Sequence, residues 1–206
     1  MSKSKSSRRW LDRHVNDPYV QRSQVDGYRS RAAYKLLEIQ ERDRILAPGM
    51  RVLDLGAAPG SWSQVARELV GRHGQVVALD LLPMAPLEGI EILEGDFRDD
   101  SVLASLRETL GGAPLDLVMS DMAPNISGTA VVDQARAIYL VELALDLARE
   151  QLKPGGAMVL KLFQGSGFDA FLRDLRGSFR QVVNRKPNAS RPESRELYLV
   201  AKGFHP

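Results

Sequence analysis

Short apolar runs alternate with longer segments of helical periodicity along most of this chain. The apolar runs are typical of buried parallel strands, and the segments between them repeat apolar residues at steps of three and four. This alternation predicts an α/β fold in which helices cover both faces of a mostly parallel sheet. The last two expected strands have no helix between them, which indicates one antiparallel strand. We expect strands at residues 52–55, 75–80, 90–96, 115–120, 157–162, 179–184 and 196–202, and helices at 30–47, 61–70, 100–110, 132–152 and 167–176.

The chain length suits one domain preceded by a short extension. A chain of 206 residues can bury one well-packed core. Residues 1–27 are polar, rich in Ser and Arg, and interrupted by Asp17-Pro18 and Asp26-Gly27. We therefore expect a basic, loosely ordered N-terminal extension over residues 1–27 and a globular domain over residues 28–206.

Basic residues gather near both ends of the chain. The net charge is only +2, but residues 1–35 carry nine Lys and Arg against three Asp and Glu. Trp10, Tyr19 and Tyr28 lie among these cations, a composition that suits stacking on bases. Such segments indicate binding of phosphate groups, most commonly those of nucleic acid, although a solvated tail and an ordinary charged surface would have the same composition. The second basic cluster comprises Arg173, Arg176, Arg180, Arg185, Lys186, Arg191 and Arg195.

Composition excludes several classes of chemistry. The chain has no cysteine, which excludes disulfides, thiolate metal sites and cysteine nucleophiles. His14, His73 and His205 lie too far apart to suggest a zinc motif, so we expect a chemistry without a metal. No apolar run approaches the roughly 20 residues of a membrane span, and the N-terminus lacks the apolar core of a signal peptide. We therefore expect a cytoplasmic protein with no membrane partner.

Glycine and charge are concentrated where the expected strands end. The first strand runs into a turn at residues 56–60, and a helix begins at Ser61. The glycines of this turn let a ligand approach the backbone, and the free N–H groups of the helix start point into it. Open α/β sheets bind ligands at the carboxyl ends of their strands. Each charged residue there could instead be a helix cap or a surface residue, but together they predict a ligand site: Asp80, Asp96, Asp121 and Lys161.

The turn indicates a ligand with a ribose but no phosphate. Its sequence, Gly56-Ala57-Ala58-Pro59-Gly60, matches neither the dinucleotide-binding pattern nor a phosphate-binding loop, and it has no lysine. Asp80 is nevertheless well placed to accept hydrogen bonds from ribose hydroxyls. S-Adenosylmethionine is such a ligand, and acidic strand ends suit its positive sulfonium.

Three segments resemble the motifs of the FtsJ-type (RrmJ/RlmE) ribosomal RNA 2′-O-methyltransferases. They are residues 54–64 (DLGAAPGSWSQ), residues 120–125 (SDMAPN) and residues 160–165 (LKLFQG), and the resemblance extends over nearly the whole chain. It implies a Rossmann-like, S-adenosylmethionine-dependent methyltransferase fold with a seven-stranded sheet. It also implies 2′-O-methylation of a uridine ribose in the A-loop of 23S rRNA, on the large ribosomal subunit, in support of ribosome assembly.

The same resemblance implies specific roles for individual residues. Lys161 would accept or steer the proton of the ribose hydroxyl, and Asp121 would orient Lys161 and the methyl donor. Lys35 and Glu196 would complete the charge network and position the ribose. The catalytic residues implied are Lys35, Asp121, Lys161 and Glu196, and the cofactor contacts are Gly56, Gly60, Trp62, Asp80, Asp96 and Asp121.

Two other functions remain open from the residues alone. A small-molecule methyltransferase on the same fold would explain the cofactor turn but not the basic segments. A non-catalytic RNA-binding factor for ribosome assembly would explain the charge but leave the four catalytic positions without a use. We expect the enzyme to act as a monomer.

Overall fold

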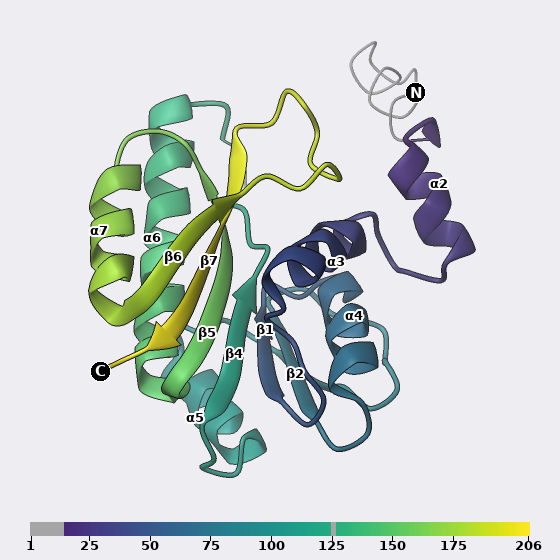
Figure 1. Cartoon of the computed structure of the whole chain (residues 1–206), viewed down its shortest axis with the longest axis vertical. Helices are drawn as coiled ribbons and strands as arrows, with labels where there is room; N and C mark the ends of the chain where they lie inside the picture. The colour runs from purple at the N-terminus through teal and green to yellow at the C-terminus, as the bar shows by residue number, and fades with distance from the viewer. Residues whose placement is uncertain (1–14, 125–126) are drawn as a thin grey trace.

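Seven strands form one sheet in the computed structural model, which describes residues 15–124 and 127–206 (Figure 1). Their order across the sheet is β3-β2-β1-β4-β5-β7-β6. β7 runs antiparallel to both neighbours, and the other pairs are parallel, as the sequence predicted. Trp10, His14 and Asn125 lie outside the described residues. The strands are β1 (Arg51–Leu55), β2 (Gln75–Asp80), β3 (Glu91–Glu94), β4 (Leu115–Ser120), β5 (Leu152–Phe163), β6 (Phe179–Arg185) and β7 (Glu196–Phe204).

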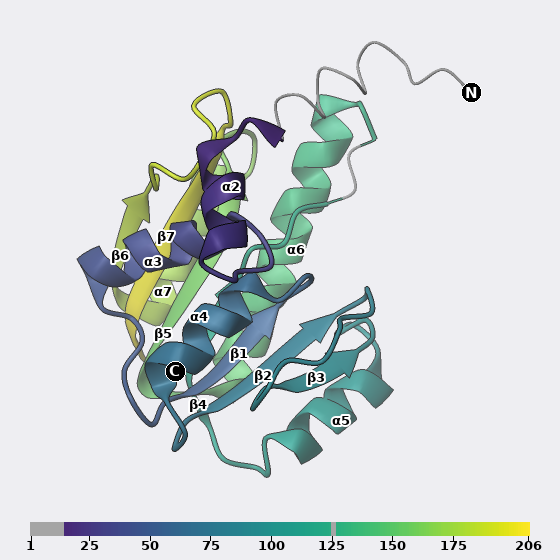
Figure 2. The same ribbon diagram turned by 90° about the vertical axis from the view of Figure 1, so that its right-hand side faces the viewer.

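Helices cover both faces of this sheet. α5, α6 and α7 pack on one face around a large apolar cluster, and α3 and α4 pack on the other around a second cluster. Figure 2 shows α2, α3 and α4 together on the near side of the sheet. Among the described helices, none is both long and apolar enough to cross a membrane. The helices are α2 (Pro18–Val25), α3 (Ala32–Asp43), α4 (Ser61–Val70), α5 (Asp100–Thr109), α6 (Ala130–Gln151) and α7 (Phe168–Ser178).

Most element boundaries follow from local sequence signals. α4, β2 and β4 have the predicted bounds. β5 differs, because it begins at Leu152 and not at residue 157. The Pro and Gly residues at 154–156 end α6 as expected, but Leu152 already pairs with Leu115 of β4 across a register shift. Tertiary pairing therefore extends this strand into a segment that the sequence marks as a turn.

The described part of the N-terminal extension is more ordered than the sequence predicted. Pro18 starts α2, where proline lacks only an N–H that a helix start leaves unpaired anyway. The side chain of Asp17 accepts a hydrogen bond from the Tyr19 N–H at 3.0 Å and caps the helix. Asp17 also pairs with Arg31, and the ring of Tyr19 lies 5.5 Å from that of Tyr34. These contacts attach α2 to the start of α3.

Candidate active site

The strand order reverses between β1 and β4, which places their carboxyl ends side by side. Leu55 pairs with Ser120, so the turn after β1 lies next to Asp121. Open α/β sheets bind ligands at such a reversal because the helices that follow the two strands lie on opposite faces and leave a crevice. The predicted glycine turn and the predicted catalytic carboxylate therefore meet at one point of the fold.

The turn after β1 is folded tightly and leaves no room for side chains at its glycines. Gly56 has φ +69°, and a Cβ atom there would lie 2.1 Å from Cγ of Met122. Gly60 has φ +107°, and a Cβ atom there would lie 2.7 Å from Cδ1 of Leu87. The peptide bond between Ala58 and Pro59 is cis. Glycine is required at both ends of the turn by backbone conformation and by close packing.

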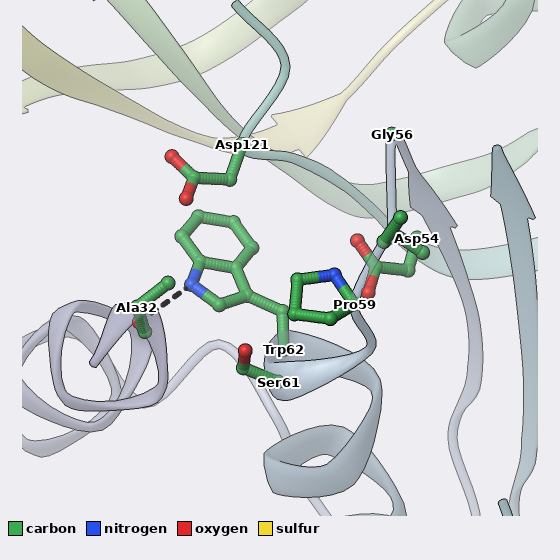
Figure 3. A pocket seen from close by; sticks show the side chains of 9 residues that line it. Ala32, Asp54, Gly56, Pro59, Ser61, Trp62 and Asp121 are labelled. Atoms are coloured by element: carbon green, nitrogen blue, oxygen red, sulfur yellow. Dashed lines mark hydrogen bonds between the residues drawn. The ribbon is translucent and has the colours of Figure 1, made fainter. Parts of the chain in front are cut away.

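A pocket opens between this turn, α3, α4 and the end of β4 (Figure 3). The indole of Trp62 forms one wall, and its Nε1–H donates to the carbonyl of Ala32 at 2.8 Å. Figure 3 shows the Asp121 carboxylate beside the six-membered ring of this indole. The pocket is lined by Ala32, Asp54, Gly56, Ala57, Ala58, Pro59, Ser61, Trp62 and Asp121.

Two carboxylates border the pocket. Asp54 is 1% exposed, and its Oδ2 accepts a hydrogen bond from the Ser63 hydroxyl at 2.6 Å. Burial raises the pKa of Asp54 to about 7, and the charges of Asp121 and Asp80 add to the rise while the Ser63 hydrogen bond opposes it. Ionisation of Asp54 is therefore unfavourable in the free protein, and a cationic ligand in the pocket would make it more favourable.

Asp54 makes the stability of the free protein depend on pH. Its folded pKa of about 7 lies above the ordinary aspartate value of about 3.9, so between these pH values the folded chain holds a proton that the unfolded chain has lost. Stability should fall as the pH rises through that window. Relative to the variant Asp54→Asn, we expect the wild type to lose about 2 kcal/mol of unfolding free energy between pH 5 and pH 7.5. Urea unfolding at both pH values measures this, and parallel profiles for the two proteins would contradict it.

Two lysine–carboxylate pairs lie behind the pocket. The Nζ of Lys161, near the end of β5, lies 3.0 Å from Oδ1 of Asp121 and also donates to its backbone carbonyl. The Nζ of Lys35, on α3, lies 2.9 Å from Oε1 of Glu196, at the start of β7. All four side chains are at most 18% exposed. The fold thus brings together the four residues that the resemblance indicated.

A buried tyrosine joins the two pairs. The hydroxyl of Tyr198 accepts a hydrogen bond from Lys35 Nζ at 2.8 Å and donates one to Asp121 Oδ1 at 2.7 Å. In the antiparallel register of β5 and β7, Tyr198 stands directly opposite Lys161. Lys35, Tyr198, Asp121 and Lys161 therefore form one continuous chain of contacts.

The electrostatics of the network keep its acids ionised. Burial by itself would raise the pKa of Asp121, but the charges of Lys161 and Lys35 and the Tyr198 hydrogen bond outweigh it and hold the pKa below its usual value. Burial opposes ionisation of Glu196 as well, and the charge and hydrogen bond of Lys35 again lower its pKa. Burial and the two nearby carboxylates raise the pKa of Tyr198 well above its ordinary value, so its hydroxyl keeps its proton.

Three of the predicted cofactor contacts do not line the pocket: Gly60, Asp80 and Asp96. Asp80 accepts hydrogen bonds from the backbone N–H groups of Ala58 and Leu82, both at 2.8 Å, which fixes its carboxylate beside the turn. Asp96 follows β3 and lies in a bidentate contact with Arg98. That contact lowers the pKa of Asp96, against a smaller effect of burial. Within the described residues, no group of three or more His, Asp or Glu side chains is placed to hold a metal ion.

The FtsJ-like methyltransferase family model matches residues 28–204. The chain belongs to this family. Ribosomal RNA large subunit methyltransferase E of Stutzerimonas stutzeri is 59% identical over 204 residues, which cover 99% of each chain. The protein of the same name from Chromohalobacter salexigens is 60% identical over 202 residues, 98% of this chain and 96% of the relative. The crystal structure of a Plasmodium falciparum protein described as a ribosomal RNA methyltransferase has a TM-score of 0.78 at 30% identity and covers 86% of this chain and 98% of that one.

Three residues in or beside the pocket and the lysine network of this FtsJ-like chain were not predicted from the sequence: Asp54, Tyr198 and Arg29. Asp54 was quoted only within a motif, although a carboxylate in an otherwise apolar strand was a signal that could have indicated it. No pattern in the sequence indicates Tyr198, because a tyrosine in a strand usually serves packing. Arg29 was counted only as positive charge.

Arg29 holds a second loop of this FtsJ-like chain against the pocket turn. Its guanidinium donates to the carbonyls of Pro59, Ala85 and Pro86 at 2.9, 2.8 and 2.8 Å. The loop after β2 thereby packs against Gly60, where an added Cβ atom would lie 2.7 Å from Cδ1 of Leu87. The planar guanidinium directs its N–H groups to three carbonyls at fixed positions, and the single ammonium of a lysine would not have this geometry.

Proposed function

We propose that this protein transfers a methyl group from S-adenosylmethionine to the 2′-hydroxyl of a uridine ribose in the A-loop of 23S rRNA. Its membership in the FtsJ-like family and the names of its relatives support a methyltransferase of large-subunit ribosomal RNA. The observation that carries the proposal is the position of Asp121, whose side chain lines the pocket and accepts a hydrogen bond from the lysine network. A methyl donor in the pocket and a hydroxyl beside Lys161 would meet there. A large-subunit substrate would place this activity in the cytoplasm.

The pocket residues fit S-adenosylmethionine. Asp121, which is ionised, supplies negative charge for a cation, and a cation bound in the pocket would also favour ionisation of Asp54, whose pKa burial raises to about 7. Asp80, fixed by two backbone N–H groups, keeps free lone pairs for ribose hydroxyls. Trp62 offers a flat apolar surface at the pocket wall. The cofactor, when bound, supplies a methyl group that a sulfonium has already activated.

The residues of the network can prepare the acceptor hydroxyl. A ribose hydroxyl is a weak nucleophile, so its proton must leave as it reacts. Lys161 would steer that proton, or receive it after giving up its own, because Asp121, which lines the pocket, holds its Nζ at two points. Lys35, tied to Glu196, would place the ribose and keep positive charge near the developing oxyanion. Alignment of the reacting groups would contribute much of the remaining rate.

Cations beside the network support a nucleic-acid substrate. The loop between β6 and β7 is attached to α3, because the Glu38 carboxylate accepts from the N–H groups of Asn188 and Ala189 at 2.6 and 2.9 Å. Arg31 donates to the carbonyl of Ala189 in this loop, and burial, followed by the charge of Arg191, lowers its pKa. A loop that carries Arg191 and is attached to α3 beside Lys35 suits contact with the phosphates of an RNA backbone.

The proposal is tested by mapping ribose methylation across ribosomal RNA. Large subunits from cells that lack this chain are incubated with the purified protein and labelled S-adenosylmethionine, and the modified nucleotide is located. We expect one 2′-O-methyluridine in the A-loop, formed by the wild type and not by Lys161→Ala. Label in small molecules without label in RNA would favour a small-molecule methyltransferase. Salt-dependent RNA binding without any methyl transfer would favour an assembly factor.

Loss of the Arg29 fork should weaken donor binding without slowing the chemistry. In Arg29→Ala three carbonyl contacts disappear and the loop after β2 is no longer held over Gly60. We expect the Kd for S-adenosylmethionine to rise about tenfold, equivalent to one charge-assisted hydrogen bond, with kcat nearly unchanged. Isothermal titration calorimetry measures the Kd. Arg107→Ala is the control, because its partner Glu150 is an exposed residue and such pairs contribute little.

A further inference from the structure

Packing alone does not explain why residue 198 is a tyrosine with a buried hydroxyl. It lies within β7 with no exposed surface, and its ring centroid is 5.7 Å from that of Trp62. Lys35 Nζ lies 5.4 Å from the same ring. A phenylalanine would fill this space equally well, and it would not bring a hydroxyl into the core. The hydroxyl is the feature that needs an explanation, because a buried polar group is costly unless it is fully bonded.

The directions of its two hydrogen bonds follow from proton counting. Asp121 is ionised, since the lysine charges outweigh the effect of burial, and a carboxylate can only accept. The single proton of the Tyr198 hydroxyl therefore points to Asp121 Oδ1, and Lys35 must be the donor to the hydroxyl oxygen. Lys35 thus donates one N–H to the Tyr198 hydroxyl and directs another to the Glu196 carboxylate.

Asp121 depends on this arrangement for its orientation. Its Oδ1 accepts from both Tyr198 and Lys161, which fixes the rotation of the carboxylate from two directions. With one contact removed, the carboxylate could turn toward whichever lysine lies nearer. The same carboxylate borders the pocket, so its rotation also sets the position of Lys161 relative to a bound ligand.

We propose that Tyr198 is a positioning residue, which connects the Lys35–Glu196 pair to the Asp121–Lys161 pair and fixes the Asp121 carboxylate between the pocket and Lys161. This inference deepens the proposed function and rests on it for its kinetic consequence. Tyr198 need not touch the substrate. It acts through Asp121, and its contribution lies in the rate of the reaction and not in the binding of the methyl donor.

The variant Tyr198→Phe separates the hydroxyl from the ring. The ring keeps its contact with Trp62, so the fold is retained, while both hydrogen bonds are lost. We expect kcat for methylation of large subunits to fall about 30-fold, the equivalent of one hydrogen bond to a charged group, with KM for S-adenosylmethionine unchanged within about twofold. A wild-type kcat, or a raised KM with an unchanged kcat, would overturn the proposal.

Tyr34→Phe is the matched control. Tyr34 is 3% exposed, and its hydroxyl donates to the carboxylate of Asp26, an exposed residue, at 2.8 Å, so this variant also removes a hydrogen bond between a buried tyrosine and a carboxylate. It should keep its kcat. An equal fall of kcat in both variants would indicate a general structural effect and would overturn the specific role of Tyr198.

Thermal melting tests the connection without any substrate. We compare the wild type with Tyr198→Phe, Asp121→Asn and the double variant. If the two side chains act as one unit, the fall in Tm of the double variant is smaller than the sum of the single falls, and additive falls would overturn the connection. If the wild type does not methylate large subunits, the proposed function fails, while the melting data still decide whether Tyr198 and Asp121 are coupled.

Discussion

Replacing Lys161 by alanine should lower kcat for methyl transfer by about a thousandfold. A positioned general acid or base contributes about 10²- to 10⁴-fold, and the Nζ of Lys161 is held at two points by Asp121, which lines the pocket. The fold should survive, because Asp121 keeps its hydrogen bond from Tyr198 and the nearby charge of Lys35. Radiolabelled methyl transfer at saturating S-adenosylmethionine measures the rate.

The charge-conserving variant Lys161→Arg distinguishes proton transfer from simple electrostatics. Arginine keeps a positive charge beside Asp121 but cannot give up its proton at ordinary pH. We expect it to be nearly as inactive as Lys161→Ala. Recovery of most of the rate in Lys161→Arg would mean that the lysine supplies charge and does not accept the proton, and near-normal rates in both variants would remove Lys161 from the catalytic machinery.

Lys153→Ala is the control for Lys161. Lys153 also lies on β5 and also pairs with an aspartate, Asp116, but it is 50% exposed and belongs to the opposite end of the strand. Such an exposed pair contributes about 0–1 kcal/mol. Its loss should leave kcat and Tm close to the wild type.

Gly56→Ala should destabilise the fold by about 3 kcal/mol and abolish binding of the methyl donor. At φ +69° an alanine is strained, and its Cβ atom would lie 2.1 Å from Cγ of Met122. Met122 is partly buried against the main apolar cluster and cannot move away freely. Because Met122 is bonded to Asp121, any displacement passes directly to the carboxylate that lines the pocket. Urea unfolding and calorimetric titration measure the two effects.

Gly112→Ala separates the clash from the backbone strain. Gly112 has φ +70°, almost the same as Gly56, but a Cβ atom there would meet nothing within 4 Å. This variant should lose about 1 kcal/mol from the left-handed backbone alone and should bind the donor normally. Equal destabilisation in the two variants would show that the contact with Met122 is not the cause.

Local signals in the sequence predicted most helices and strands, and the predictions were wrong where tertiary contacts determine the bounds of an element. Residues 61–70 form α4 as expected because a glycine turn precedes them and Gly71 follows, both independent of the rest of the chain. The start of β5 was predicted too late, because its pairing with Leu115 on a distant strand outweighs the local preference of proline and glycine. The sequence predicted a loosely ordered segment where α2 forms, because the contacts that Arg31 and Tyr34 make with Asp17 and Tyr19 come from a later part of the chain.

The sequence predicted the residues of the candidate site but not the contacts between them. Charged residues after apolar strands indicated Asp121 and Lys161, since the carboxyl ends of parallel strands share one edge. Lys35 and Glu196 came only from the family resemblance. Lys35 lies on an amphipathic helix, where a lysine is usually exposed, and its burial depends on the sheet face that α3 covers. No local pattern could have indicated that.

The sequence by itself determined the alternation of strands and helices, the glycine turn and the carboxylates near it, because these depend on neighbours a few residues away. Only the tertiary structure decided which charges meet. The antiparallel direction of β7 places Tyr198 opposite Lys161, 37 positions away along the chain, and α3 brings Lys35 to the same hydroxyl. Strand order and register are set by burial of the apolar faces as a whole. The network at Asp121 is therefore a property of the assembled sheet and not of any one segment.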